Sequence, residues 1–231
     1  LTRMAQFELT LLDWAENHKG SKKYVAFADK CWPAFPSQFG FEPCYVNSRL
    51  ASRGIPVACE VDIYGALSEY IGMCASGDTV TLLDINNSVP KYIYDEDITG
   101  KFNYKLTDTF MGFHCGNTPS RGTLEGDIAP SDITFYRLQC DSEGQLRAYI
   151  AQGEILPVAT RSFGGIAIFA IPEMGRFYRH VLIQKRYPHH GAVAFGHYGK
   201  TLFEVFKFLG IADIAYNQPK SLPYPTENPF A

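Results

Sequence analysis

The chain has 231 residues, of which 46 % are hydrophobic and 19 % are charged, and its formal net charge is −3. This is a globular composition with enough chain to bury a large core. The weak negative charge and the lack of any lysine- and arginine-rich run argue against a nucleic-acid partner. Every apolar stretch is shorter than the ~18 residues that span a bilayer, and the N-terminus lacks a secretory signal pattern. We therefore expect a cytoplasmic protein with no membrane partner.

The cysteines favour the same compartment. They stand at positions 31, 44, 59, 74, 115 and 140, and none forms a C-x-x-C pair. Such spacing encodes neither a zinc ribbon nor a redox pair, and it is sparser than the spacing of small disulfide scaffolds. We expect buried free thiols. The chain begins at Leu1 inside a helical pattern, which we interpret as the start of a fragment of a longer functional unit.

The first 88 residues alternate predicted helices and strands. Apolar residues at three- and four-residue steps predict a helix over residues 1–19. Further helices are expected around 45–52 and 63–74, and short buried strands at 24–28, 55–59 and 80–85, with a Pro- and Phe-rich loop after Pro33. This alternation predicts a partial parallel sheet with crossover helices, so we assign residues 1–88 to an α/β region that belongs to a larger domain.

After residue 88 the chain becomes rich in β-branched and aromatic runs broken by turn residues. A hairpin is predicted for residues 133–150, with its turn at 141–144. Other strands are expected at 109–113, 162–171, 177–184 and 211–216, and a short helix at 201–209. The predicted fold class is therefore α/β followed by antiparallel β, with residues 89–231 forming a barrel or sandwich.

Two carboxylates, Glu60 and Asp62, stand where a buried strand ends and a helix begins. That crevice is where open α/β sheets place their ligands. Asp62 could equally be the N-cap of the helix, because Asp is a favoured capping residue. For an isolated E-x-D motif the capping role is the more frequent one.

Three histidines lie within nine residues near the end of the chain, and His190 is one of them. Imidazole is the commonest nitrogen ligand for a metal, although a Gly-rich turn with histidines bonded to backbone explains the pattern equally well. Carboxylate oxygens with one imidazole suit Mn²⁺ or Mg²⁺ better than structural zinc. His114 follows a predicted strand and could orient a sugar hydroxyl or be a hydrogen-bonded core residue.

Three separated motifs, in the same order, resemble the L-fucose/L-arabinose isomerase family, and the similarity extends over about residues 25 to 215. The motifs are Cys31-Trp32-Pro33 through Ala58-Cys59-Glu60-Val61-Asp62-Ile63-Tyr64-Gly65-Ala66-Leu67, then Phe113-His114-Cys115-Gly116-Asn117, then Pro188-His189-His190-Gly191-Ala192-Val193-Ala194-Phe195-Gly196-His197. The resemblance implies a cytoplasmic homo-oligomer that interconverts an aldose and a ketose with Mn²⁺. It also implies a C-terminal β-barrel after the α/β region, and chains much longer than this one.

The resemblance also implies roles for individual residues. The metal ligands would be Glu60, Asp62 and His190, the catalytic acids Asp62 and Glu42, and the sugar-binding residues Trp32, His114 and Asn117. Which of Glu60 and Asp62 binds the metal directly differs between the two branches of the family. Spacing from Trp32 selects Glu42 as the second acid, whereas spacing from Arg49 selects Ala34, which can do no acid–base chemistry.

The function expected from these residues is a metal-dependent isomerisation of a monosaccharide through an enediolate, with carboxylates moving the proton. Two alternatives remain open. One is a non-catalytic sugar-binding or assembly domain, which Ala34 favours. The other is a metal-dependent aldolase or epimerase, which would use similar ligands but lacks the ordered motif match.

Overall fold

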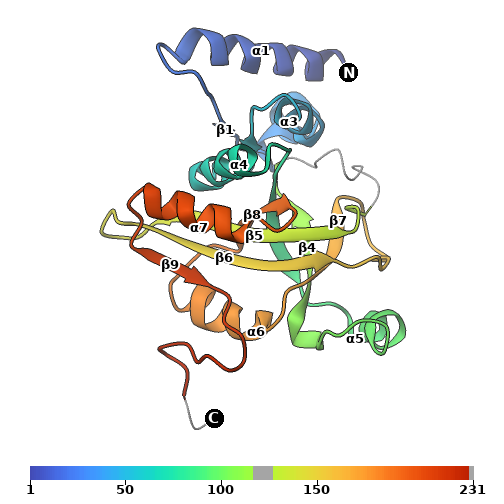
Figure 1. Cartoon of the computed structure of the whole chain (residues 1–231). Coiled ribbons are helices and arrows are strands. Elements are labelled where there is room, and N and C mark those ends of the chain that lie inside the picture. The colour runs from blue at the N-terminus through green and yellow to red at the C-terminus, as the bar shows by residue number, and fades with distance from the viewer. Residues whose placement is uncertain (117–126, 229–231) are drawn as a thin grey trace.

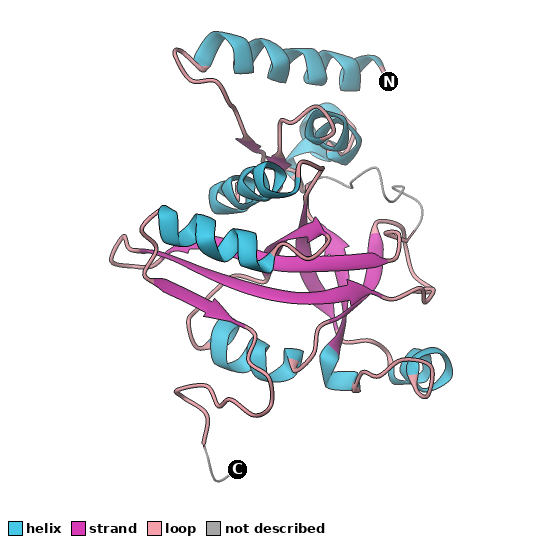
Figure 2. Ribbon diagram, in the orientation of Figure 1, coloured by secondary structure: helices cyan, strands magenta, loops and turns pink. Residues whose placement is uncertain are grey.

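The computed structural model describes residues 1–116 and 127–228, and a closed antiparallel barrel forms its lower half (Figures 1 and 2). The barrel closes because β5 pairs with both β8 and β6, which gives the circular order β5-β8-β3-β4-β7-β6. The barrel strands are β3 (Thr81–Asn87), β4 (Thr109–His114), β5 (Ser131–Cys140), β6 (Leu146–Ile155), β7 (Ile166–Ala170) and β8 (His190–Phe195). A further strand, β9 (Asp213–Tyr216), extends β6 in parallel.

Helices surround the barrel, and the half above it holds α1 to α4 together with a two-stranded parallel sheet. The longer helices are α1 (Thr2–His18), α2 (Ala34–Phe39), α3 (Cys44–Ala51), α4 (Ile63–Ser76) and α7 (Gly199–Phe208). The shorter ones are α5 (Lys91–Ile93), η1 (Tyr94–Ile98), η2 (Leu106–Asp108), α6 (Met174–Phe177) and η3 (Tyr178–Ile183). The small sheet pairs β1 (Phe27–Ala28) with β2 (Val57–Ala58). As Figure 1 shows, α1 and α3 lie farthest above the barrel, and α4 lies between them and its wall.

Aromatic side chains fill the barrel interior. Phe110 stacks on Phe169 with ring centroids 5.3 Å apart, and Phe135 packs on Tyr149 at the same distance. Gly191 on β8 makes room for this packing, because a Cβ there would come within 2.5 Å of both Phe135 and Tyr149. The barrel is therefore a packed core and not an open channel.

Helices cover the outer faces of the barrel. The buried residues of α4 and α7 pack against β5, β6 and β8 in one cluster, and the segment from Val89 to Leu106 covers β4 and β7 in another. Tyr136 on β5 fixes α4 in place, because its hydroxyl donates a hydrogen bond to the Ser68 carbonyl at 2.9 Å. The start of α4 is thereby held at the upper rim of the barrel.

Most predicted elements are confirmed, including the first helix, the helices that became α3, α4 and α7, and the 133–150 hairpin. Three predictions are wrong. The expected strand at 177–184 is helical, because Phe177 and Val181 recur at helical spacing and both face the core; a short apolar run does not reveal its period. The expected loop after Pro33 contains α2. The strand predicted at 80–85 is β3, which joins the barrel antiparallel to β4 and β8 instead of extending the parallel sheet.

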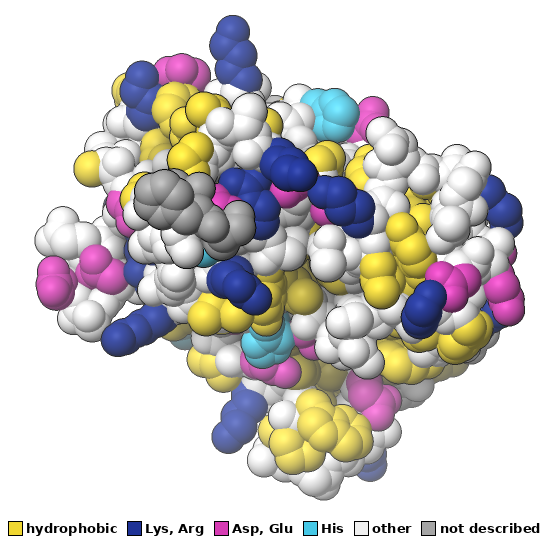
Figure 3. Space-filling model, turned by 90° about the horizontal axis from the view of Figure 1, so that it is seen from below, with side chains coloured by type: hydrophobic (Ala, Val, Ile, Leu, Met, Phe, Trp, Pro, Cys, Tyr) yellow, Lys and Arg dark blue, Asp and Glu magenta, His cyan; other side chains and the backbone are white. Residues whose placement is uncertain are grey.

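The described surface gives further context. None of the helices in residues 1–116 and 127–228 has the length and apolar character that crossing a bilayer requires. On the lower face, basic, acidic and hydrophobic side chains are interspersed, so one sign of charge does not dominate it (Figure 3).

The domain boundary expected near residue 88 stays a prediction. The strand that precedes it, β3, belongs to the barrel.

Substituting Phe169→Ala should lower the free energy of unfolding by about 3–5 kcal/mol, since it leaves a cavity in the barrel core. Phe208→Ala is the matched control, because Phe208 is 91 % exposed and its removal should change stability by less than about 0.5 kcal/mol. Urea denaturation of both variants checks the prediction. Equal midpoints for the two variants would contradict the packed-barrel interpretation.

Candidate metal centre

Asp62 joins the helical half of the chain to the barrel. Its Oδ1 accepts the Gly65 backbone N–H at 2.8 Å, which makes it the N-cap of α4. Each of its two oxygens also accepts a hydrogen bond from one terminal nitrogen of Arg137 on β5, both at 2.7 Å. Burial of this carboxyl favours its neutral form, but hydrogen bonds from His190 and Arg137 hold the pKa of Asp62 well below its usual range. Asp62 is therefore an ionised, fully engaged carboxylate.

His190, at the start of β8, is oriented by that carboxylate. Its Nδ1 lies 3.1 Å from Asp62 Oδ2, which directs the opposite nitrogen, Nε2, toward Glu60 and Cys115. Nε2 is 3.6 Å from Glu60 Oε2 and 3.5 Å from Cys115 Sγ. Burial opposes protonation of the ring, yet hydrogen bonds to Asp62 and Cys115 raise the pKa of His190 to about 10. Metal-ligating histidines commonly have one ring nitrogen held by a carboxylate, and a cation at Nε2 of His190 would have to displace the proton that the raised pKa keeps on this ring.

The turn that carries Glu60 is strained. Glu60 and Val61 both have a φ of 58°, in the left-handed region that costs non-glycine residues about 1–3 kcal/mol each. Two backbone hydrogen bonds hold the turn: Val61 N–H donates to the Asp29 carbonyl at 2.8 Å, and Asp62 N–H to the Cys59 carbonyl at 3.0 Å. The consequence is that Glu60, 56 % exposed, reaches His190 from the solvent side while Asp62 reaches it from the protein side.

His189 completes a group of three donors. One ligand atom from each of Glu60, His189 and His190 lies within 4.8 Å of the others. The ring of His189 packs beside that of His190 at 4.4 Å, and its Nε2 is 3.4 Å from Asp84 Oδ1 on β3. A carboxylate with two imidazoles at this spacing would hold a divalent cation such as Mn²⁺.

The other four predicted site residues are not part of this group of metal-ligand side chains. Trp32 is 68 % exposed, and Glu42 is an exposed residue between α2 and α3 with no hydrogen bond or ion pair to any residue in the described part of the chain. His114, on β4, is buried, and its Nδ1 has no hydrogen-bond partner among the described residues. Asn117 lies outside the described residues. The roles predicted for these four residues stay predictions.

Two residues of the site were not selected from the sequence, although each left a signal. Arg137 is a lone cation within the buried strand run Ile133–Leu138, and a charge there needs a buried partner. His189 directly precedes the selected His190. The sequence does not encode strand pairing locally. It therefore could not show that Arg137 pairs with Asp62, or that both His189 and His190 lie near the carboxylates.

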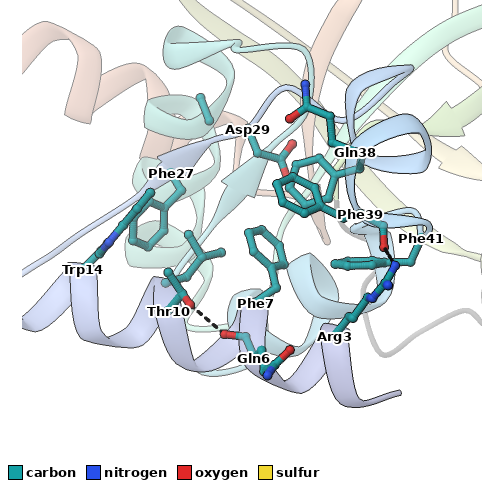
Figure 4. Close-up of a pocket in the computed structure, with 13 residues that line it drawn as sticks. Arg3, Gln6, Phe7, Thr10, Trp14, Phe27, Asp29, Gln38, Phe39 and Phe41 are labelled. Carbon is teal, nitrogen blue, oxygen red and sulfur yellow. Dashed lines mark hydrogen bonds between the residues drawn. The ribbon is translucent and has the colours of Figure 1, made fainter.

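A separate aromatic cavity of about 690 Å³ lies between α1, α2 and β1 (Figure 4). Its aromatic lining residues are Phe7, Trp14, Phe27, Phe35, Phe39 and Phe41. It contains none of Glu60, Asp62 and His190, so its size does not make it the metal site. Asp29 is the carboxylate in its lining.

The buried ring of His114 should make stability depend on pH. Burial lowers its pKa to about 4, so between about pH 6.5 and 4 the unfolded chain takes up a proton that the folded chain does not. Stability should therefore fall as the pH drops through this window, by about 3 kcal/mol at about 1.4 kcal/mol per unit of pKa difference. Denaturation at pH 7 and pH 4.5 should show a smaller decrease in His114→Gln than in the unmodified protein. His18→Gln, at the exposed end of α1, should keep the full decrease; equal pH profiles for all three proteins would contradict this account.

Comparison with known proteins shows similarity to one domain family and to several longer proteins. Residues 96–216, just over half of the chain, match the model of the L-fucose isomerase C-terminal domain. The chain is 25 % identical to the sulfoquinovose isomerase of Priestia aryabhattai over 226 residues, covering 94 % of this chain and 48 % of that protein. It is 26 % identical to that of Alkalicoccus urumqiensis over 219 residues, 90 % of this chain and 47 % of the relative.

The relative from Clostridium sp. (strain MSTE9), also a sulfoquinovose isomerase, is 30 % identical over 158 residues, covering 64 % of this chain and 34 % of the relative. The chain spans about half the length or less of these curated relatives. The family match begins within η1 and ends with β9, so it includes β4 to β8 of the barrel and the predicted metal histidine. The chain therefore belongs to the family defined by the L-fucose isomerase C-terminal domain.

Proposed function

We propose that this chain forms the metal-binding part of an aldose–ketose isomerase that acts on a monosaccharide. The single observation that carries the proposal is the approach of Glu60 Oε2 to His190 Nε2, 3.6 Å apart, in a chain of this family. The two residues are far apart in sequence and come from different parts of the fold. Their convergence on a solvent-accessible point supports a bound Mn²⁺ or Mg²⁺.

The names of the relatives support a sugar as the substrate, because the three described above are sulfoquinovose isomerases. We propose sulfoquinovose as the first sugar to assay, followed by L-fucose and L-arabinose. The cytoplasmic location and the homo-oligomer come with the family resemblance and stay predictions.

The chain's own residues would divide the work as follows. Glu60 and His190 would hold the cation, and Asp62 would orient His190 while Arg137 keeps Asp62 ionised. A divalent cation bound there supplies Lewis-acid stabilisation of the two neighbouring sugar oxygens. Moving the carbonyl between adjacent carbons then needs one group that removes a proton and returns it, which a carboxylate can do with a contribution of about 10²–10⁴-fold. Glu42 is the predicted second acid.

Glu60→Gln should abolish Mn²⁺ binding at this centre, because it replaces the anionic oxygen ligand with a neutral amide. Glu42→Gln is the matched control: the same substitution at an exposed residue should leave Mn²⁺ affinity unchanged. Calorimetric titration of Mn²⁺ into the full-length protein measures both, and conversion of sulfoquinovose measures turnover. Unchanged Mn²⁺ affinity in Glu60→Gln would remove Glu60 from the centre.

Turnover in Glu42→Gln tests the second acid separately. If Glu42 carries the proton, turnover should fall by about 10²–10⁴-fold with Mn²⁺ bound normally. Unchanged turnover would exclude it.

Asp62→Asn distinguishes an orienting role from proton transfer. As the partner of a metal-bound histidine, Asp62 should contribute about 10–100-fold to Mn²⁺ affinity, so activity should return once Mn²⁺ is saturating. If Asp62 carries the proton instead, as also predicted, activity should stay low at every Mn²⁺ concentration. Full activity and full Mn²⁺ affinity in Asp62→Asn would exclude both roles.

A non-catalytic sugar-binding or assembly role is the second candidate. Ala34, on α2, occupies one of the two positions expected for the second acid, and the alternative, Glu42, is exposed and unengaged among the described residues. Mn²⁺ and sugar binding without any conversion in the full-length protein would favour this role.

A further inference from the structure

A second group of ligand-type side chains lies beside the Glu60–His190 pair, on the other side of the same turn. Ligand atoms of Asp29, Cys31 and Cys59 all lie within 4.8 Å of one another. Cys59 is buried and Cys31 half-buried, and both are free thiols. None of these three residues belongs to the centre described above.

Strand pairing explains why the three residues meet. β1 and β2 are parallel with Ala28 opposite Ala58, so Asp29 and Cys59 are the residues that follow directly at the carboxyl ends of two adjacent strands. The Asp29 backbone N–H continues the ladder by donating to the Ala58 carbonyl at 2.9 Å. Cys31 follows two residues later, where the chain turns back over the sheet. The group is therefore built by backbone hydrogen bonds and not by flexible surface side chains.

The Asp29 carboxylate is only half used. Its Oδ2 accepts a hydrogen bond from Asn47 Nδ2 at 2.9 Å, whereas its buried Oδ1 receives no N–H or O–H donor from the described residues. The Cys59 thiol also hydrogen-bonds this carboxyl, but an S–H group is only a weak donor. A buried carboxylate oxygen without such a donor costs free energy unless another group compensates it. A cation between this oxygen and the two sulfurs would supply that compensation.

The donor set indicates which cation. Two thiolates and one carboxylate suit soft or borderline ions such as Zn²⁺, whereas Mn²⁺ and Mg²⁺ prefer oxygen ligands. Asp29 also lines the aromatic cavity, where Figure 4 shows it among Phe27, Gln38 and Phe39. That cavity leaves an approach to the cluster for a fourth ligand from solvent.

We propose that Asp29, Cys31 and Cys59 form a binding site for a thiophilic divalent cation of the Zn²⁺ class, with one coordination position open toward the aromatic cavity. The site does not depend on the isomerase function proposed above. It would place a soft-metal site one residue away from a hard-metal site along the chain.

Titration of Co²⁺, a spectroscopic substitute for Zn²⁺, into the reduced, metal-free full-length protein tests the proposal, with Mn²⁺ added first to occupy the Glu60–His190 pair. The near-ultraviolet thiolate-to-Co²⁺ absorption band should appear at one equivalent. Cys31→Ser and Cys59→Ser should each lower Co²⁺ affinity by more than about 100-fold, since even losing an outer partner of a metal ligand costs about 10–100-fold. Cys74→Ser, at an exposed thiol on α4, is the matched control and should leave the band unchanged.

Cys115 provides the decisive comparison, because its sulfur lies 3.5 Å from His190 Nε2 and could itself give a thiolate band. A band that is lost in Cys115→Ser but kept in the Cys31→Ser, Cys59→Ser double variant would overturn the proposal. So would the absence of any band in the unmodified protein.

A measurement on the unmodified protein avoids any folding defect in the variants. Cd²⁺ should slow alkylation of the half-buried Cys31 by iodoacetamide, read out by peptide mass spectrometry, while the exposed Cys74 keeps reacting at its original rate. Equal alkylation rates at Cys31 with and without Cd²⁺ would overturn the proposal.

Discussion

The buried ion pair between Asp62 and Arg137 is the interaction on which the candidate metal centre depends. It joins the first turn of α4 to a wall of the barrel with two 2.7 Å hydrogen bonds. The Arg137 guanidinium also donates to the His190 carbonyl at 3.2 Å, so the start of β8 is fixed by the same group. Burying two charges is costly, and their attraction offsets that cost only when the geometry is good and the remaining donors are satisfied. Here the Gly65 backbone N–H of α4, the Arg137 guanidinium of β5 and the His190 imidazole of β8 all engage the Asp62 carboxylate.

This arrangement separates two carboxylates that are only two residues apart. The Arg137 guanidinium balances the charge of the buried Asp62 carboxylate, whereas the exposed Glu60 carboxylate lies beside the imidazoles of His189 and His190. The separation depends on the left-handed backbone at Glu60 and Val61, which turns consecutive side chains to different sides. A regular helix or strand through these residues would not place an exposed carboxylate and a buried one on opposite sides of one ring. The left-handed turn therefore lets one carboxylate hold Nδ1 of His190 while a second carboxylate approaches Nε2.

Most individual helices and strands could be predicted from the sequence, but the pairing between strands far apart in the chain could not. Periodicity identified α4 and the hairpin of β5 and β6, because helical and strand burial leave different repeats in the chain. It failed for Phe177–Ile183, where a short run of apolar and aromatic residues satisfies both repeats. Metal-binding roles for Glu60, Asp62 and His190 were predicted from motifs shared with a family; the structure brings the three side chains together, and the roles themselves stay predictions. Arg137 was missed because its partner is 75 residues away, and only the closed barrel brings the two together.

The two adjacent residues after β2, Cys59 and Glu60, belong to two different groups of possible metal ligands. Cys59 lies with the carboxylate and thiol that follow β1, while Glu60 lies with the imidazoles that precede and begin β8. Parallel pairing of β1 and β2 fixes the first neighbourhood, and the ion pair of Asp62 with the barrel fixes the second. Because sulfur and oxygen donors prefer different cations, two such neighbourhoods on one turn would sort metals by softness without any change in backbone position. The short strand β2 and the strained turn after it therefore position one residue of each group, Cys59 and Glu60.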